Sequence, residues 1–250
     1  MAASSSDRAA AAATGAAASP YDAIARLYDP WSLSVVEDID FYVEEALASG
    51  GPVVELACGT GRIAVPVAQA GITVIGVDAS LGMLEVARER AAAAGVGAIL
   101  DLRPGDLREP PVTERVPLVL IPFRSLLHMT TEADRERALA AAYGLLAPGG
   151  RLIFDVFAPD SEDIEVTHGR WLEREPGIFE RADWDAGERT LTLSVRRGEE
   201  ASTMVLAWLA PVEWRRLLER AGFTVEAQYG WFDRRPYTDE EDVVFVARRA

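Results

Sequence analysis

Hydrophobic and polar residues follow two different periods along the first two thirds of the chain. Short apolar runs typical of buried strands recur between segments with the spacing of an amphipathic helix. The expected order is helix 35–48, strand 53–57, helix 62–70, strand 72–78, helix 80–94, strands 98–102 and 116–123, helix 132–146 and strand 151–157. Strands and helices in regular alternation predict an open parallel sheet covered by helices on both faces.

The pattern changes beyond residue 157. Residues 171–209 read as short amphipathic strands, with Ile178–Trp184 and Thr190–Val195 on either side of a turn at 185–188. A helix over 212–221 and strands over 223–229 and 243–247 complete the chain. We therefore expect an α/β fold with an inserted β-hairpin layer.

One domain accounts for nearly the whole pattern. Residues 1–19 are small and repetitive, which predicts a disordered Ala/Ser-rich tail. The expected division of the rest is 20–50 for N-terminal helices, 51–160 for the core, 161–209 for the inserted antiparallel strands, and 210–250 for a helix and strand pair. Neither an internal repeat nor a second linker interrupts residues 20–250.

Composition narrows the classes of partner. The 250 residues carry a net charge of −15, which disfavours nucleic acid as a ligand. All basic residues are Arg, so lysine Schiff-base chemistry and the lysine-bearing phosphate loop are excluded. A single cysteine allows no intrachain disulfide, and no apolar run reaches the roughly 18 residues of a membrane helix. We expect a cytoplasmic protein without a metal site or a membrane partner.

Candidate ligand-binding residues follow the predicted strands. In open parallel sheets, ligands bind beyond the carboxyl ends of the strands. Gly59 and Gly61 allow the backbone to approach a ligand closely, and Asp78 can accept hydrogen bonds from a ribose diol. Asp106 can accept one from an exocyclic amine, and apolar walls for an adenine ring are expected from Met83 and Leu107. The pattern predicts an adenosine-containing ligand.

Three functions remain open on these residues. The glycines and Asp78 also suit an NAD(P)-dependent oxidoreductase, although a Tyr-x-x-x-Lys site cannot exist in a chain without lysine. A cysteine-ligated zinc dehydrogenase is implausible with one cysteine, whereas His128 and His168 leave a histidine-based dehydrogenase open. The other two functions rest on a family resemblance that the following segments carry.

Several segments together resemble the class I S-adenosylmethionine-dependent methyltransferases of the small-molecule type. They are Glu55-Leu-Ala-Cys-Gly-Thr-Gly61, Val77-Asp78 followed by Ser80 and Met83-Leu84, Gly105-Asp106, and Leu146-Ala-Pro-Gly-Gly150. The resemblance implies a Rossmann-like, doubly wound, seven-stranded and mostly parallel sheet with an antiparallel C-terminal strand. The family often has glycine where this chain has Ala57, which is small enough to preserve cofactor binding.

The same resemblance assigns roles to individual residues toward S-adenosylmethionine. It implies that Glu55 and the Gly59–Gly61 turn hold the methionine end, Asp78 the ribose and Asp106 the adenine amine, with the backbone near Phe123 meeting the methionine amino group. Residues 20–50 would form a lid over the cofactor. The full expected set is Tyr21, Tyr28, Glu55, Ala57, Gly59, Gly61, Asp78, Ala79, Met83, Asp106, Leu107 and Phe123.

Residues for the methyl acceptor are expected after the fourth and fifth strands. His128 can act as a general base or pack at a helix start, and Asp155 can be a base or a hydrogen-bonding partner within the sheet. Arg124 can clamp a carboxylate on the acceptor or form a structural salt bridge. A flat apolar pocket could be lined by Trp171, Trp184, Tyr229, Trp231 and Phe232, although the strand spacing of several of them is explained more simply by core packing. We expect a methyltransferase with a small-molecule acceptor, methylated on oxygen or nitrogen. A methyltransferase-like binding protein without turnover is the alternative that the resemblance leaves open.

Overall fold

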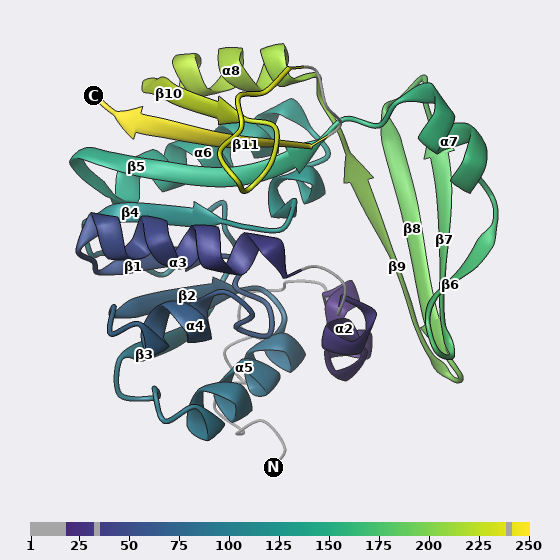
Figure 1. Ribbon diagram of the computed structural model, residues 1–250, viewed down its shortest axis with the longest axis horizontal. Helices are drawn as coiled ribbons and strands as arrows, with labels where there is room; N and C mark the ends of the chain where they lie inside the picture. Colours follow the sequence, from purple (N-terminus) through teal and green to yellow (C-terminus); the bar gives the residue numbers. More distant parts are fainter. Residues whose placement is uncertain (1–18, 33–35, 239–241) are drawn as a thin grey trace.

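A seven-stranded sheet forms the centre of the molecule in the computed structural model, which describes residues 19–32, 36–238 and 242–250 (Figure 1). Six strands are parallel, and β11 is antiparallel to both of its neighbours. The spatial order is β10 (Phe223–Tyr229), β11 (Asp242–Arg249), β5 (Leu146–Phe157), β4 (Val116–Ile121), β1 (Val53–Leu56), β2 (Val74–Asp78) and β3 (Leu100–Pro104). The expected doubly wound sheet is confirmed.

Helices cover both faces of this sheet because alternate strand residues are apolar on both sides. Val53 on β1 packs among α3 (Glu37–Ser49), α4 (Ala64–Gln69) and α5 (Leu81–Ala93). The next residue, Val54, faces the opposite core, to which α6 (Glu132–Leu145) and α8 (Pro211–Arg220) contribute. Burial on both faces explains why the parallel strands read as continuous apolar runs.

The inserted segment forms a second sheet beside the first (Figure 1). It begins with α7 (Ser161–Thr167) and continues as four antiparallel strands: β6 (Trp171–Glu175), β7 (Ile178–Asp185), β8 (Thr190–Arg197) and β9 (Glu200–Ala207). The expected hairpin β7–β8 is therefore the middle of a larger layer. The inner face of this sheet supplies the buried side chains of Ile178, Val195 and Met204.

Two short N-terminal elements lie between the two sheets. The 3-10 helix η1 (Pro20–Ile24) packs beside β9, and α2 (Ala25–Trp31) contacts both α5 and β6 (Figure 1). Ile24 and Leu27 are fully buried against the inserted sheet. The tail predicted for residues 1–19 lies outside the described residues except for Ser19, which caps η1 by accepting a hydrogen bond from Tyr21 N.

Some predicted boundaries differ from the structure for a backbone reason. Strand β4 ends at Ile121, two residues earlier than expected, because Phe123 and Arg124 take left-handed conformations with φ of 57° and 60°. Helix α4 begins at Ala64 instead of residue 62, since Gly59 and Gly61 also have positive φ. Each shift falls at the carboxyl end of a central strand, where turns open the sheet to a ligand.

Candidate functional site

A cavity of about 820 Å³ lies at the carboxyl ends of the central strands. Its wall combines the loops after β1, β2, β3 and β4 with η1, α2 and the inner face of the inserted sheet. Ten of the twelve residues expected at the cofactor line it: Tyr21, Tyr28, Ala57, Gly59, Asp78, Ala79, Met83, Asp106, Leu107 and Phe123. Arg124 and His128 also line it, whereas Glu55, Gly61 and Asp155 lie behind the wall.

The turn after β1 places backbone, not side chains, against the cavity. Gly59 has φ +54°, and a Cβ built there would meet no atom within 4 Å. Gly61 serves packing instead, because its Cβ would lie 3.2 Å from Val65 and 3.4 Å from Ala87. Ala57 also adopts a positive φ of 58° without being glycine. This turn is therefore held in a conformation that L side chains rarely adopt.

Asp78 ends β2 and links two of the cavity loops. Its Oδ2 accepts a hydrogen bond from Gly59 N at 2.8 Å, and its Oδ1 accepts one from Ser80 N at 2.8 Å. Withdrawal from bulk water raises the pKa of this carboxyl to about 6, although both backbone N–H groups oppose the rise. The carboxylate is thus fixed at the cavity wall, and each oxygen keeps a further lone pair for a ligand hydroxyl.

Glu55 lies on β1 behind the Gly59 turn. Only 2% of it is exposed, and Oε2 has no hydrogen-bond partner. Burial raises the pKa of the Glu55 carboxyl well above its usual value, while nearby Arg62 acts in the opposite direction. An unpaired buried acceptor is costly in a folded protein, so Glu55 Oε2 offers an unused bonding position close to the cavity loops.

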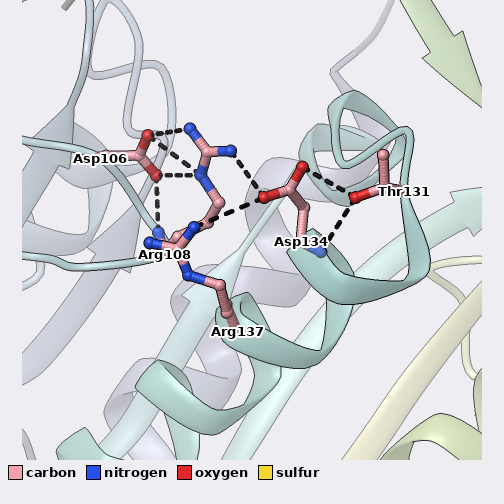
Figure 2. Close-up of polar contacts among 5 residues, drawn as sticks. All are labelled: Asp106, Arg108, Thr131, Asp134 and Arg137. Atoms are coloured by element: carbon pink, nitrogen blue, oxygen red, sulfur yellow. Dashed lines mark hydrogen bonds and ion pairs between the residues drawn. The ribbon is translucent and has the colours of Figure 1, made fainter.

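Asp106 and Arg108 form a compact ion pair in the loop after β3. Both carboxylate oxygens of Asp106 accept from the Arg108 guanidinium, and Oδ1 also accepts from Arg108 N at 2.8 Å. Arg108 extends the contact to Asp134 Oδ1 at 2.7 Å on the first turn of α6 (Figure 2). The Arg108 contact lowers the pKa of Asp106, so this carboxylate remains ionised.

Phe123 and Arg124 form a strained turn that Asp155 holds in place. The carboxylate of Asp155, on β5, accepts from Phe123 N at 2.7 Å and from Arg124 N at 3.0 Å. Tyr42, on α3, donates its hydroxyl to the same carboxylate at 2.6 Å. Asp155 is 4% exposed, and burial raises its pKa to about 6. These contacts favour the hydrogen-bonding role for Asp155 over that of a base.

His128 faces the cavity together with a tyrosine of the N-terminal segment. Its Nε2 lies 3.0 Å from the Tyr21 hydroxyl, and the two rings meet edge to face at 5.5 Å. Desolvation lowers the pKa of His128 to about 4 and raises that of Tyr21. Both groups are therefore neutral near pH 7.

The side chain of Arg124 already has protein partners. It donates to Asp242 Oδ1 at 2.7 Å and lies over the Phe157 ring at 4.8 Å. The structural salt bridge is thus present, and an acceptor carboxylate would share the guanidinium with Asp242. This pair could not be predicted from sequence patterns, because Asp242 lies 118 positions further along the chain.

The N-terminal segment lines the cavity and contacts elements of both sheets. Asp22 Oδ1 accepts from Ser80 Oγ and Gly82 N at the start of α5. At the other side, Trp31 Nε1 donates to Glu180 Oε2 at 2.9 Å on β7. Tyr21 and Tyr28 pack edge to face at 5.8 Å within the cavity wall. The segment is thereby fixed between the two sheets as part of the cavity wall.

The inserted sheet makes the opposite end of the cavity mostly apolar. Its contribution consists of Ala182, Trp184, Leu191, Leu193 and Leu206, together with the ion pair Arg174–Glu180.

Of the five aromatic residues expected at such a pocket, Trp184 alone is part of this wall. Tyr229 and Phe232 pack on Phe41 of α3 instead, and Trp231 packs on Phe232. Trp171 is 38% exposed and lies beneath Arg196. The core role that the sequence left open for several of them therefore applies to Tyr229 and Phe232, because strand periodicity does not reveal which sheet face meets the cavity.

Within the described residues, no helix is long and apolar enough to cross a membrane. The same part of the chain contains no group of three or more His, Cys, Asp or Glu side chains placed to hold a metal ion.

Comparison with known proteins agrees with this geometry. Residues 53–150 match the family described as "Methyltransferase domain". A putative methyltransferase of Geobacillus sp. (strain WCH70) is 26% identical over 89% of this chain and 93% of its own length. The solved CcbJ methyltransferase from Streptomyces caelestis is 26% identical with a TM-score of 0.83, covering 93% of this chain and 98% of that one.

A further solved structure shares the fold and contains the cofactor. The glycopeptide N-methyltransferase MtfA, complexed with S-adenosylmethionine, has a TM-score of 0.59 at 24% identity, covering 85% of this chain and 95% of that one. The motifs, the sheet topology and these similarities agree. Residues 53–150 thus match a methyltransferase domain, and nearly the whole chain is similar in sequence and fold to S-adenosylmethionine-dependent methyltransferases.

Proposed function

We propose that this enzyme transfers the methyl group of S-adenosylmethionine in line to an oxygen or nitrogen atom of a small molecule. One observation carries the proposal. A single cavity joins ten of the expected cofactor residues with the apolar inner face of the inserted sheet. A cofactor on the strand loops and an acceptor against the inserted sheet would therefore share one space, which methyl transfer requires.

The residues present fit the cofactor. Asp78 offers fixed carboxylate oxygens to the ribose hydroxyls, and the open space beside Gly59 admits close approach of the ligand to the backbone. Glu55 Oε2 lacks a partner, which suits a site for a cationic amino group held directly or through water. We assign Met83 and Leu107, both buried in the wall, to the faces of the adenine ring.

The chain's own contribution to the reaction is positioning. When bound, S-adenosylmethionine supplies a methyl group that its sulfonium already activates, so the cofactor carries the demanding chemistry. The protein residues hold the acceptor in line and exclude water. Ideal orientation alone can lower the barrier by roughly 7 to 11 kcal/mol. Tyr21 and Tyr28 enclose the cavity from the N-terminal side, which keeps solvent from the acceptor.

His128 is proposed to orient the acceptor while remaining neutral. A group whose pKa is about 4 is a weak base for an acceptor that still carries its proton at neutral pH. The Tyr21 hydroxyl also occupies Nε2. An amine in its free-base form, or an oxygen that is already ionised, would need no proton removed. Arg124, paired with Asp242 at the cavity wall, is proposed to contact a polar group of the acceptor.

The size of the cavity and the charge of the protein limit which acceptors fit. A cavity of about 820 Å³ has to hold both ligands, and its acceptor end is walled by aliphatic and aromatic side chains. The net charge of −15 opposes a polyanionic acceptor such as nucleic acid. We propose a compact, largely apolar acceptor.

Calorimetric titration with S-adenosylhomocysteine, and separately with NAD and NADP, tests the cofactor assignment. We expect micromolar binding of S-adenosylhomocysteine alone. Binding of a nicotinamide cofactor alone would overturn the proposal and leave the fold unchanged.

Turnover is tested with methyl-labelled S-adenosylmethionine and a panel of amines, phenols and carboxylates. Transfer of label to a member of the panel supports the enzyme proposal and identifies the acceptor atom. Cofactor binding without transfer to any acceptor class would favour a binding protein without turnover.

A further inference from the structure

Arg108 is placed to influence how the cavity recognises the purine base of its cofactor. Its neighbour Asp106 lines the cavity, but the Asp106 side chain is 42% exposed and no backbone group outside its own loop holds it. A carboxylate on an exposed loop is normally free to rotate. Here the guanidinium of Arg108 binds the Asp106 carboxylate in a bidentate manner. Nε donates at 2.9 Å to Oδ1, and Nη2 donates at 2.5 Å to Oδ2.

The Asp106–Arg108 ion pair is also connected to a helix outside the loop. Arg108 Nη1 donates at 2.7 Å to Asp134 Oδ1 on α6. Asp134 is fixed in turn, because its Oδ2 accepts from Thr131 Oγ1 at 2.9 Å and its N–H donates to the same hydroxyl at 3.1 Å (Figure 2). Thr131 is the N-cap of α6. The Asp106 carboxylate is thereby oriented by a rigid helix.

This arrangement leaves Asp106 with limited bonding capacity. A carboxylate has about four lone-pair positions. Arg108 contacts Oδ1 through its backbone N–H and Nε, and it contacts Oδ2 through Nη2 and, at 3.1 Å, through the same Nε. Because the longer Nε contact is one half of a shared N–H, Oδ2 is the oxygen with room for a further donor. What remains is an acceptor of fixed direction with no proton to donate, since the Arg108 contact keeps Asp106 ionised. Such a group attracts an amine donor and repels a carbonyl oxygen.

We propose that Arg108 is a positioning residue that sets base specificity, making the site prefer a 6-amino purine over a 6-oxo purine by fixing Asp106. The inference rests on the proposed function, because it places the adenine end of the cofactor at Asp106. Arg108 itself touches neither ligand. Its effect passes entirely through the orientation of the Asp106 carboxylate.

The test compares two product analogues that differ at one purine position. S-adenosylhomocysteine carries an amine there, and S-inosylhomocysteine carries a carbonyl oxygen. We expect the Arg108→Gln variant to lose about tenfold in the ratio of the two affinities measured by calorimetry, through weaker binding of the adenosyl compound. Arg108→Lys should lose most of this ratio as well, because lysine keeps the charge but cannot form the bidentate hydrogen bonds.

The matched control is Arg103→Gln. Arg103 also makes ion pairs with two carboxylates, Asp101 and Glu114, but it is not part of the cavity wall. We expect its ratio to equal that of the parent. Melting curves of all three variants establish that the compared proteins are folded.

The outcomes separate this inference from the proposed function. If the parent protein fails to bind S-adenosylhomocysteine, the cofactor assignment is wrong. If the parent binds it and Arg108→Gln keeps the parental ratio, only the inference is overturned. If Arg108→Lys keeps the parental ratio while Arg108→Gln loses it, charge and not bidentate hydrogen bonding to Asp106 sets the specificity, and the inference is overturned.

Discussion

The two ends of the cavity differ in what faces the ligand. At the loops of the main sheet, the wall consists of backbone turns and fixed carboxylates, as at Gly59, Asp78 and Asp106. At the inserted sheet, aliphatic and aromatic side chains such as Leu193 and Trp184 predominate. Fixed hydrogen-bonding groups recognise one particular ligand, whereas an apolar wall tolerates changes in the shape of its ligand.

The same difference extends to backbone strain. Ala57, Phe123 and Arg124 have positive φ without being glycine, and all three line the cavity. Conformations of this kind cost about 1 to 3 kcal/mol each and persist only where surrounding contacts enforce them. In the inserted sheet, the cavity-facing residues of β7, β8 and β9 pair in regular antiparallel register. The strained backbone thus lies at the end of the cavity where we propose that the cofactor binds.

The largest expected effect concerns Asp78. Asp78→Ala should lower the affinity for S-adenosylhomocysteine by about 2 to 4 kcal/mol, since two charge-assisted hydrogen bonds to the ribose are lost. Calorimetric titration measures the change, with Leu193→Asn at the other end of the cavity as the control. Equal affinities of Asp78→Ala and the parent would contradict our placement of the cofactor.

Removal of the Asp155 carboxylate should have a slightly smaller effect, on stability. Asp155→Ala leaves Phe123 N, Arg124 N and the Tyr42 hydroxyl without their partner, so we expect a loss of about 3 kcal/mol in the free energy of unfolding. Tyr42→Phe removes one of these bonds and should cost about 1 kcal/mol. Urea unfolding gives both values. Equal losses in the two variants would mean that Asp155 does not hold the strained turn.

Lowering the pH should decrease the free energy of unfolding because His128 is buried in its neutral form. Its pKa is about 4 in the folded protein, against about 6.5 in an unfolded chain, so the unfolded state takes up the proton first. The stability that depends on neutral His128 is therefore fully present above pH 6.5 and is lost as the pH falls toward 4. Between pH 7.5 and 5 we expect the parent to lose about 2 kcal/mol more than His128→Gln does.

The control for this titration is His168→Gln, because that variant retains His128 and should keep the parent's extra loss. Buried carboxyls such as Asp78 and Asp155 titrate in all of these proteins and cancel in the comparison. Parallel stability profiles for the parent and His128→Gln would show that His128 is accessible to protons.

The smallest effect is expected at the apolar end. Leu193→Asn should raise the KM for the acceptor about fivefold, from loss of apolar contact, with unchanged affinity for S-adenosylhomocysteine. Steady-state kinetics with an acceptor from the panel provides the measurement. The control is Val205→Asn, since Val205 is 46% exposed and is not part of the cavity wall. A lower cofactor affinity in Leu193→Asn would mean that the two ends do not act separately.

Much of the cofactor end could be predicted because its signals are local. Gly59, Asp78 and Asp106 each follow a short apolar strand, and parallel strands necessarily bring their carboxyl ends to one edge of the sheet. Only Glu55 and Gly61 among the expected cofactor residues lie outside the cavity wall. Both belong to the same motif, in which the sequence does not distinguish a residue that faces the ligand from one that packs behind it.

The contacts that hold the strand-loop end of the cavity in place could not be predicted from the sequence. Tyr42 and Asp155 are 113 positions apart, and Tyr42 sits in an amphipathic helix that gives no sign of reaching a carboxylate. Arg108 follows Asp106 by two positions, but its link to α6 depends on how that helix docks. Pairings of this kind arise only when separate elements pack together.

The sequence by itself determined the order of strands and helices, and the motifs at the strand ends that identify the family, because these depend on local periodicity and turn chemistry. Tertiary structure decided which side chains face the cavity. Trp184 reaches the cavity while Tyr229 and Phe232 pack on α3, although all of them lie in or beside strands. Periodicity places a residue on one face of its strand, but only the packing of two sheets against the N-terminal segment determines what that face meets.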